Sequence, residues 1–441
     1  MTSTTFNTLI ERFPTSETLF AWLKSPEGGS LSIRDTRVQP DDEFVIIHYT
    51  KDSDMSLEHV PYFRSVVWNA VTNQPVCVAP TKSLTTPPTS FTVVEDFVDG
   101  VMINMFWTKM GWRLATRTKL DAGNTFYSRR PFATLFMEAV AAAGLDLMSL
   151  SPLYTYSWVL QHPEERIVVA PLYGVPKLFL VEMRDSNLEV DHDPGRPQLL
   201  ALMPKRHTLA TVQDAMDRVQ AWGVRFGAQW KGLMLKTNGA RYSLTSDQYL
   251  EALALRGNVA KLPFVWLERF AEKKLNQYLT LYPEEANSAT ATVEAFKTCT
   301  QEAYDLYQQI YRRREFPLGQ APQKYRKLLW DIHAKRAGSY FPNLVAFMNE
   351  QDTARKLWLV NYEVRYAVNQ QEVAEREQAQ TPTDAALNQL ADELEGRAAV
   401  NQQEAAEEAD REQAQTQETL DAAESQTLDA YTLSEQPDSV S

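Results

Sequence analysis

Short apolar runs rich in β-branched and aromatic residues recur between Glu43 and Asn258, and this texture stops after Asn258. Runs of roughly four to eight such residues, bounded by turn-forming residues, are typical of β-strands. We expect strands at Phe44–Tyr49, Arg64–Trp68, Val76–Ala79, Phe91–Glu95, Val101–Trp107, Trp112–Thr116, Tyr154–Leu160, Lys177–Met183, Gly232–Lys236 and Ala240–Thr245. The first six predict an antiparallel meander with a hairpin over Thr108–Gly111, and the last two predict a hairpin over an Asn-Gly turn.

Helical periodicity appears between some of these strands. One expected helix, Phe132–Ala143, has its apolar residues on one face at a spacing of about 3.6 residues. That face consists of Phe132, Leu135, Phe136, Ala139 and Val140. The pattern also predicts a short helix over Phe13–Lys24 and another over Thr211–Trp222, with Thr208 or Thr211 as its N-cap.

Residues 259–366 have a helical pattern. Its apolar stripes consist of Phe296, Cys299, Ala303, Leu306, Tyr307 and Ile310, and of Leu328, Leu329 and Ile332. We therefore expect an α+β protein with four parts. They are an N-terminal segment (1–43), an antiparallel-sheet body (44–258), an all-helical domain (259–366) and a disordered, acidic low-complexity tail (367–441).

The net charge of −13 comes from the tail. From Gln371 to Ser441 the chain has 18 acidic and three basic residues, whereas residues 1–370 have 39 acidic and 41 basic residues. The repeated segments AVNQQE and REQAQT are rich in Gln, Glu and Ala, and such a composition cannot offset chain entropy by burial. We expect a solvated or transiently helical tail; the alternatives are a docking segment for a protein partner and a nucleic-acid mimic.

Composition excludes several other classes of protein. Two cysteines exclude a disulfide scaffold and a Cys-rich zinc site. The first residues resemble no signal peptide, and the longest apolar runs fall far short of the roughly 20 residues of a membrane span. We expect a cytoplasmic protein without membrane association.

Asp191-His192-Asp193 has the composition of a metal cluster, but its Pro/Gly-rich surroundings favour a hydrated turn.

Four segments carry the strongest functional signal through their order. They are Tyr62–Lys82 (YFRSVVWNAVTNQPVCVAPTK), Glu95–Trp107 with Trp112–Ala122 (EDFVDGVMINMFW, WRLATRTKLDA), Tyr154–Val169 (YTYSWVLQHPEERIVV), and Lys231–Lys236 with Arg241–Asn258 (KGLMLK, RYSLTSDQYLEALALRGN). In this order they resemble the active-site segments of the RNA ligases of phages and large DNA viruses, within the covalent nucleotidyltransferase superfamily. The resemblance implies a ligase-type fold, ATP as cofactor and RNA as partner.

The family's chemistry defines what each position would do. A lysine amine attacks the α-phosphorus of ATP and holds AMP as a phosphoramidate. Carboxylates position the ribose and Mg²⁺, and lysines of the last strand neutralise charge on the phosphate. The resemblance assigns nucleotide binding here to Glu95, Asp99, Gly100, Arg166, Lys231, Lys236 and Arg241.

Departures from the family pattern fall at its reacting centre. Phe97 stands in the place of the nucleophilic lysine, and Lys231 replaces a metal-binding Glu. Ser157 stands where the family has Glu, while Ser243 and Thr245 stand where it has two lysines. Because a phenyl ring has no lone pair to give, we interpret the chain as a pseudoenzyme that binds nucleotide or RNA but has lost autocatalytic adenylation.

Two alternatives remain. One is an active ATP-dependent RNA ligase with a displaced nucleophile, either Lys82 or Lys119 in the strand after the first motif, which would need a lowered pKa. The other is an interaction or structural protein that recruits a partner through its acidic tail. A further hypothesis is that the Lys231 ammonium, with Lys236 and Arg241, binds a phosphate as a point charge without Mg²⁺.

The helical domain is the expected RNA platform. Its basic residues include Arg312, Arg313, Arg314, Lys324, Arg326, Lys327, Lys335 and Arg336, interleaved with Tyr304, Tyr307, Tyr311, Tyr325 and Trp330. Basic groups contact phosphate, and aromatic rings stack on unpaired bases. The alternative is that the aromatic residues form a core and the charges a solvated face.

Overall fold

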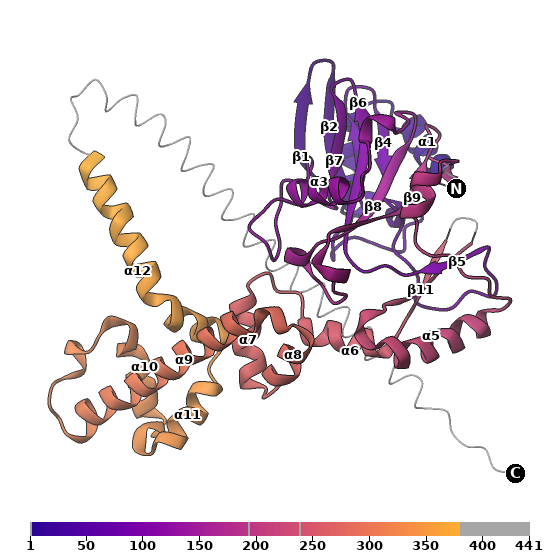
Figure 1. Ribbon diagram of the computed structural model, residues 1–441. Helices are drawn as coiled ribbons and strands as arrows, with labels where there is room; N and C mark the ends of the chain where they lie inside the picture. Colours follow the sequence, from indigo (N-terminus) through magenta and orange to yellow (C-terminus); the bar gives the residue numbers. More distant parts are fainter. Residues whose placement is uncertain (1, 193–194, 238–239, 380–441) are drawn as a thin grey trace, which may run out of the picture. The chain divides into compact units, whose positions relative to one another are not determined.

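The computed structural model describes residues 2–192, 195–237 and 240–379, and side-chain burial is not described for residues 2, 368–369 and 371–379. The chain divides into two compact units, with the boundary between Arg256 and Gly257. Antiparallel sheets with flanking helices form the first unit, and the described part of the second is helical (Figure 1). The expected α+β class is confirmed. Most of the expected acidic tail lies outside the described residues.

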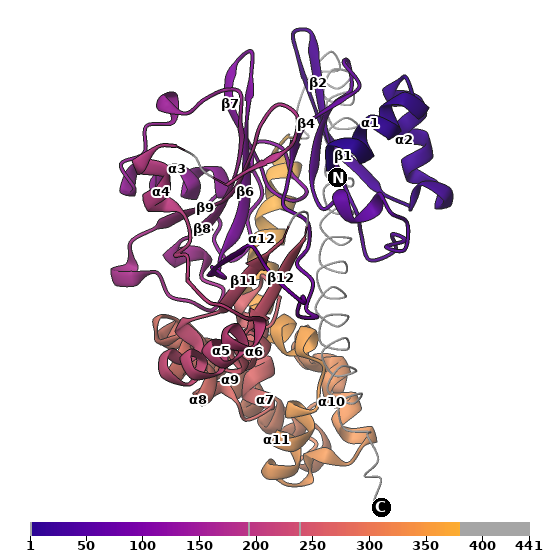
Figure 2. The ribbon, with the colours of Figure 1, turned by 90° about the vertical axis from the view of Figure 1, so that its right-hand side faces the viewer.

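The first sheet is an antiparallel meander whose second strand is covered on both faces. Its strands are β1 (Ser32–Gln39), β2 (Asp42–His48), β3 (Val66–Asn69) and β4 (Gln74–Val78), in that order. Val45 and Ile47 pack with helices α1 (Thr2–Arg12) and α2 (Ser16–Lys24), which lie on one side of the sheet (Figure 2). Phe44 and Ile46 pack instead with Phe106 of the second sheet. This arrangement explains an uninterrupted apolar run in β2.

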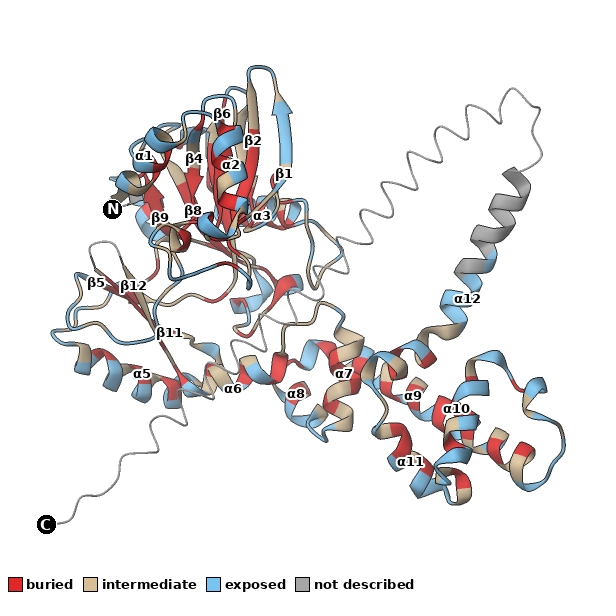
Figure 3. Cartoon of the chain, turned by 180° about the vertical axis from the view of Figure 1, so that it is seen from behind, coloured by how far each residue is buried: buried red, intermediate tan, exposed pale blue. Residues whose placement is uncertain are grey.

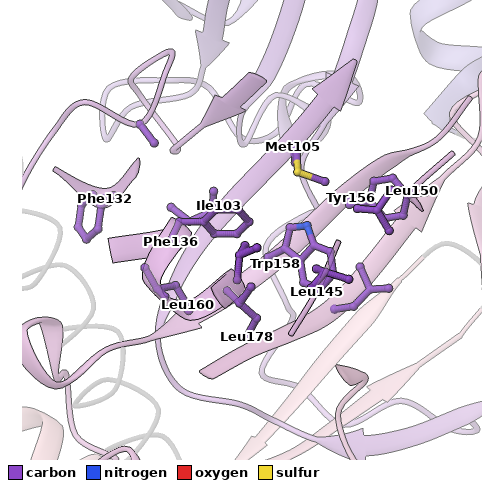
Figure 4. Close-up of a cluster of buried hydrophobic side chains, with 14 of the residues drawn as sticks. Ile103, Met105, Phe132, Phe136, Leu145, Leu150, Tyr156, Trp158, Leu160 and Leu178 are labelled. Carbon is purple, nitrogen blue, oxygen red and sulfur yellow. The ribbon is translucent and has the colours of Figure 1, made fainter. Parts of the chain in front are cut away.

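The second sheet has the order β10-β9-β8-β6-β7. Its strands are β6 (Val101–Thr108), β7 (Gly111–Ala115), β8 (Thr155–Gln161), β9 (Lys177–Arg184) and β10 (Val190–Asp191). The predicted hairpin is confirmed, because Thr108 pairs with Gly111. Helix α3 (Phe132–Ala142) covers one face, where Phe136 lies among Ile103, Trp158 and Leu160 (Figure 4). All five residues of its predicted apolar face are buried.

The third sheet joins strands that are far apart in the sequence. Its order is β12 (Arg241–Thr245), β11 (Gly232–Lys236) and β5 (Val93–Asp96), all antiparallel. Helix α5 (Val212–Phe226) packs on this sheet through Ala215 and Val219, and Thr211 caps its N-terminus in a capping box with Asp214. Thr211, rather than Thr208, is therefore the cap. The Asn-Gly turn between β11 and β12 lies outside the described residues.

Some local expectations are wrong. The run at Phe91–Glu95 does not join the meander: β5 pairs with β11, because strand partners are chosen by tertiary contacts and not by neighbourhood in the sequence. The helix expected from Phe13 begins only at Ser16, after Pro14, and an additional helix, α1, precedes it. Lys119 lies beyond the end of β7 and not within a strand.

Two α-helices of the first unit remain, one between β10 and α5 and one after β12. They are α4 (Pro197–Leu202) and α6 (Asp247–Arg256). Of the Asp191-His192-Asp193 cluster, Asp191 belongs to the short strand β10, and Asp193 lies outside the described residues.

The second unit contains a helical core. Its helices are α7 (Leu262–Ala271), α8 (Leu275–Leu281), α9 (Ala286–Tyr307), α10 (Gln323–Ala334), α11 (Phe341–Asn349) and α12 (Thr353–Ala379). Both predicted apolar stripes enter this core, with only Leu306 partly buried. Figure 3 shows buried segments on α9, α10 and α11. Among the described residues, no helix has the length and apolar character that crossing a bilayer requires.

Candidate functional site

Asp99 is the centre of the site, in the connection between β5 and β6. Its side chain is 2% exposed. Oδ2 accepts hydrogen bonds from the backbone N–H groups of Val168 and Val169, both at 3.0 Å. Oδ1 accepts one from the Tyr249 hydroxyl at 2.5 Å and lies 3.5 Å from Nζ of Lys231. One carboxylate therefore holds together the β5–β6 connection, the loop after β8, the start of β11 and helix α6.

Lys231 and Phe97 meet because the pairing of β5 with β11 continues beyond the two strands. The Phe97 N–H donates to the carbonyl oxygen of Gly232 at 2.9 Å, which brings the two side chains together. Nζ of Lys231 lies 4.1 Å from the centroid of the Phe97 ring and 5.2 Å from that of Tyr249. An ammonium at such a distance from a ring interacts favourably with its π electrons.

The environment of Lys231 disfavours its charged form. Burial lowers the pKa of Lys231, the negative charge of Asp99 and its hydrogen bond raise that pKa, and the positive charge of Arg64 lowers it again. The net direction is below the ordinary pKa of a lysine because desolvation outweighs the ion pair. The side chain keeps 18% of its surface exposed.

Two glycines let the strands approach closely around Asp99. Gly100 has a φ of +138°, and a Cβ there would lie 2.3 Å from the carbonyl oxygen of Leu160 in β8. Gly232 has a φ of +147°, and its Cβ would lie 2.0 Å from the carbonyl oxygen of Leu244 in β12. Both positions need glycine for backbone conformation and for space. The glycine that follows each charged residue, Gly100 after Asp99 and Gly232 after Lys231, therefore fixes the local backbone position.

A second lysine–carboxylate pair joins β5 and β11. Nζ of Lys236 lies 2.6 Å from Oε1 of Glu95 and donates to the carbonyl oxygen of Val181 at 2.9 Å. Both side chains are buried, and the other carboxylate oxygen, Oε2 of Glu95, has no hydrogen-bond partner among the described residues. Lys236 also lines a small recess with Glu182 and Asp191. The two pairs, Lys231–Asp99 and Lys236–Glu95, link the two ends of β11 to β5 and to the connection that follows it.

Arg241 lies close to Arg64, which the sequence reasoning did not include among the site residues. Nη1 of each guanidinium lies 3.4 Å from the carbonyl oxygen of Thr81. Leu84, a little further along, hydrogen-bonds with the β12 backbone: its N–H donates to the Arg241 carbonyl at 2.8 Å. The segment before β5 therefore runs beside β12, and its Thr81 carbonyl lies close to the cations of both Arg64 and Arg241.

Arg166 helps to hold the loop after β8 in place. Its Nε donates to the carbonyl oxygen of Val168 at 3.0 Å, and its own carbonyl accepts from Arg256 at 3.0 Å. It lines, with Asp99 and Gly100, a shallow recess that has no room for a water molecule. Ligand pockets usually measure about 300–1,000 Å³. A whole nucleotide therefore does not fit this recess as the structure has it.

Neither lysine suggested as a displaced nucleophile joins Asp99. Lys82 has an exposed side chain in the connection before β5. Lys119 lies 3.4 Å from Oδ1 of Asp35, with 30% of its side chain exposed. The structure brings a different amine, Lys231, to Phe97.

Neutral hydroxyl groups occupy three of the positions where the resemblance to RNA ligases implies charged groups. Ser157 Oγ donates to Oδ1 of Asn104 at 2.9 Å inside the sheet, and Ser83 Oγ donates to Ser243 Oγ at 3.1 Å. The third such position, Thr245, pairs with Gly232 in the ladder. The positive charge of this region comes instead from Lys231, Lys236 and the two arginines near Thr81.

The donor set at Asp99 does not fit Mg²⁺. A magnesium ion requires carboxylate and water oxygens at about 2.0–2.1 Å in an octahedron. Both oxygens of Asp99 already accept hydrogen bonds, and an ammonium takes the place of a further carboxylate. In the described parts of the chain, no three His, Cys, Asp or Glu side chains are grouped as metal ligands.

In the second unit, the aromatic residues of the predicted RNA platform differ in how far they are buried. Tyr307 and Tyr325 belong to the core, whereas Trp330 is 60% exposed on α10. Arg312, Arg313, Arg314, Arg326 and Lys327 are exposed. Lys324 is more enclosed and lies 2.9 Å from Oε1 of Glu363. The core alternative therefore holds for two of the tyrosines, and Trp330 remains available for stacking.

Sequence reasoning missed Tyr249, which donates to Asp99. The local signal is Ser246, whose Oγ accepts from the Tyr249 N–H at 3.3 Å, as an N-cap residue does. The Ser246 N–H also donates to the Lys231 carbonyl at 2.9 Å. The start of α6 thus positions both Tyr249 and Lys231, but only the fold shows that they converge on Asp99.

Comparison with known proteins finds no matching family model and no matching curated protein. Among solved structures, the chain resembles an archaeal ATP-dependent RNA ligase at 13% identity and a TM-score of 0.40, over 67% of this chain and 82% of the ligase. It resembles a putative ATP-dependent DNA ligase from Aquifex aeolicus at 14% identity and a TM-score of 0.37, over 71% of this chain and 80% of that one. A Naegleria gruberi RNA ligase mutant with ATP and Mn matches at 12% identity and a TM-score of 0.26, over 36% of this chain and 50% of that one.

Proposed function

We propose that this chain is a ligase-type nucleotidyltransferase relative, of the kind found in phages and large DNA viruses, that binds the phosphate of a nucleotide or RNA. The observation that carries the proposal is the meeting of Lys231 with Phe97 and Asp99. Phe97 cannot act as a nucleophile. The same point of the fold nevertheless holds a partly exposed cation, which suits a phosphate.

Lys231 is free to exchange its partner. Its 3.5 Å contact with Asp99 is longer than the roughly 2.7–2.9 Å of a strong charge-assisted hydrogen bond. A phosphate oxygen can therefore compete for the ammonium while Asp99 keeps its three other donors. Arg64 adds positive charge near Lys231. ATP is the nucleotide expected, and the ammonium supplies the charge that a metal ion would otherwise provide.

Equilibrium binding of ATP and of single-stranded RNA to the full chain, in EDTA, tests this proposal. Lys231→Ala should weaken binding at least about tenfold, equivalent to about 1.4 kcal/mol. Lys109→Ala, at an exposed lysine beside Asp41, is the matched control and should leave the affinity unchanged. Equal affinities of the Lys231→Ala variant and the unaltered protein would refute the proposal.

A second RNA contact in the helical unit is favoured by the exposure of Trp330. Lys327 precedes it by one helical turn on α10 and is also exposed. An aromatic face beside a cation can stack on a base while the cation contacts the phosphate. We propose that Trp330, Lys327 and Arg312–Arg314 bind unpaired RNA.

A further inference from the structure

We propose that Lys231 is the displaced nucleophile of this protein: its amine attacks the α-phosphorus of a bound nucleoside triphosphate and carries the nucleotidyl group. The inference deepens the proposed function and rests on it, because the phosphate must first bind beside Lys231. It assigns the covalent step to a lysine at the start of β11 and not to the β5–β6 connection.

The position of the amine supports the assignment. Nζ of Lys231 lies over the Phe97 ring at 4.1 Å, so an amine from β11 reaches the side chain that stands in the lysine's place. The continued β5–β11 pairing fixes this approach through the Phe97–Gly232 hydrogen bond. Gly232 holds the strand close, since a Cβ there would collide with β12. Lys231 therefore starts from a rigid part of the sheet, which favours a reproducible geometry of attack.

Comparison with the other lysines of this region also selects Lys231. Lys236 is held by Glu95 at 2.6 Å and by the Val181 carbonyl at 2.9 Å, so two close contacts already occupy its ammonium. Lys119 lies beside Asp35, and Lys82 is exposed. Lys231 alone among these four combines enclosure against two aromatic rings with a single long carboxylate contact.

Every charged or titratable group facing Lys231 affects its readiness to attack. Nucleophilic lysines are commonly activated by an apolar surrounding or a neighbouring cation. Burial and Arg64 both lower the pKa of Lys231, whereas Asp99 raises it. The Tyr249 hydroxyl donates to Asp99 and shares the carboxylate's charge, which weakens its hold on the ammonium.

The chemical step balances without an additional reactant. The ammonium first releases one proton to water, which leaves a lone pair on Nζ. That pair forms the N–P bond to the α-phosphorus, and the bond from the α-phosphorus to the bridging oxygen breaks. Pyrophosphate leaves with that electron pair, and the second amine proton passes to solvent. The product is a phosphoramidate of Lys231 with a nucleoside monophosphate.

The experiment incubates the full chain with the magnesium salt of ATP labelled at the α-phosphate, followed by denaturation and peptide mapping. We expect acid-labile label on the peptide that contains Lys231. Lys231→Ala and Lys231→Arg should both lose the label at least about a hundredfold, and Lys109→Ala should retain it. Because Lys231→Arg keeps the positive charge, it separates nucleophilic attack from phosphate binding.

Parallel binding measurements separate the two proposals. ATP binding with no covalent label would overturn the assignment of Lys231 and leave the proposed function intact. Label on Lys82, Lys119 or Lys236 would also overturn it. Absence of ATP and RNA binding would overturn both proposals. Thermal unfolding of the variants by circular dichroism identifies any that fail to fold, and competitive acetylation of the unaltered protein then tests the amine directly: Lys231 should react at a lower pH than Lys109.

Discussion

Lys236 of β11 and Glu95 of β5 form a diagonal ion pair across neighbouring antiparallel strands, with 2.6 Å between Nζ and Oε1. Both side chains are less than one tenth exposed. A charge in such surroundings is stable only while its partner remains. The pair therefore links the binding region to the stability of the third sheet.

Removing one member of this pair should be more harmful than removing both. Lys236→Met leaves the Glu95 carboxylate buried without its cation, and we expect a loss of about 3–5 kcal/mol in the free energy of unfolding. The double variant Glu95→Leu/Lys236→Met should recover most of that loss. Urea denaturation measures both. Equal stability of the single variant and the unaltered protein would contradict the structure.

Gly100 should tolerate no side chain. Gly100→Ala introduces a Cβ 2.3 Å from the Leu160 carbonyl at a φ of +138°, and we expect a loss of at least about 2–3 kcal/mol. Gly144→Ala is the control, because its φ is +61° with no atom within 4 Å of the new Cβ. It should lose only about 1 kcal/mol. Similar losses in the two variants would show that space at Gly100 is unimportant.

The lowered pKa of Lys231 predicts a pH-dependent contribution to stability. Between its pKa in the folded protein and the ordinary value of about 10.4, the unfolded chain binds more protons than the folded one. Stability therefore rises with pH through this interval. Lys231→Met should remove that rise. The free energy of unfolding of the unaltered protein should therefore increase relative to that of the variant as the pH increases. Urea titrations at several pH values measure this difference.

Asp99 should control the pKa of Lys231. Asp99→Asn removes the negative charge that favours the ammonium, so we expect the pKa of Lys231 to fall further. Competitive acetylation followed by mass spectrometry, over a range of pH, reports the pKa of this single amine. An unchanged or higher pKa would mean that Asp99 does not stabilise the ammonium.

Trp330 and the exposed basic residues of the helical unit should contribute differently to RNA binding. Trp330→Ala should cost about 1–3 kcal/mol in affinity for single-stranded RNA and leave the salt dependence unchanged, because stacking carries no net charge. The triple alanine variant of Arg312–Arg314 should reduce the slope of log affinity against log salt by up to about 2. Tyr173→Ala, at an exposed aromatic residue of the first unit, serves as the control. Filter binding at several salt concentrations distinguishes these effects.

Local patterns in the sequence specify the local structure and the missing amine. Apolar periodicity identified the buried face of α3, and all five of its predicted residues are buried. Strand composition and turn spacing predicted the β6–β7 hairpin, and the identity of residue 97 alone excludes it as a nucleophile. These features depend on residues that are close together in the sequence, so the sequence alone predicts them.

Contacts between residues that are far apart in the sequence follow from the three-dimensional fold. The pairing of β5 with β11 overturned the expected meander at Phe91–Glu95, and it brings Lys231 to Phe97 and Asp99. Lys231 and Asp99 are 132 residues apart, and no local pattern specifies that contact. Nor did local sequence show that Tyr249 donates to the same carboxylate. Such contacts form because long-range strand pairing and shared burial select one arrangement of the whole chain, and the lowered pKa of Lys231 is a consequence of that arrangement.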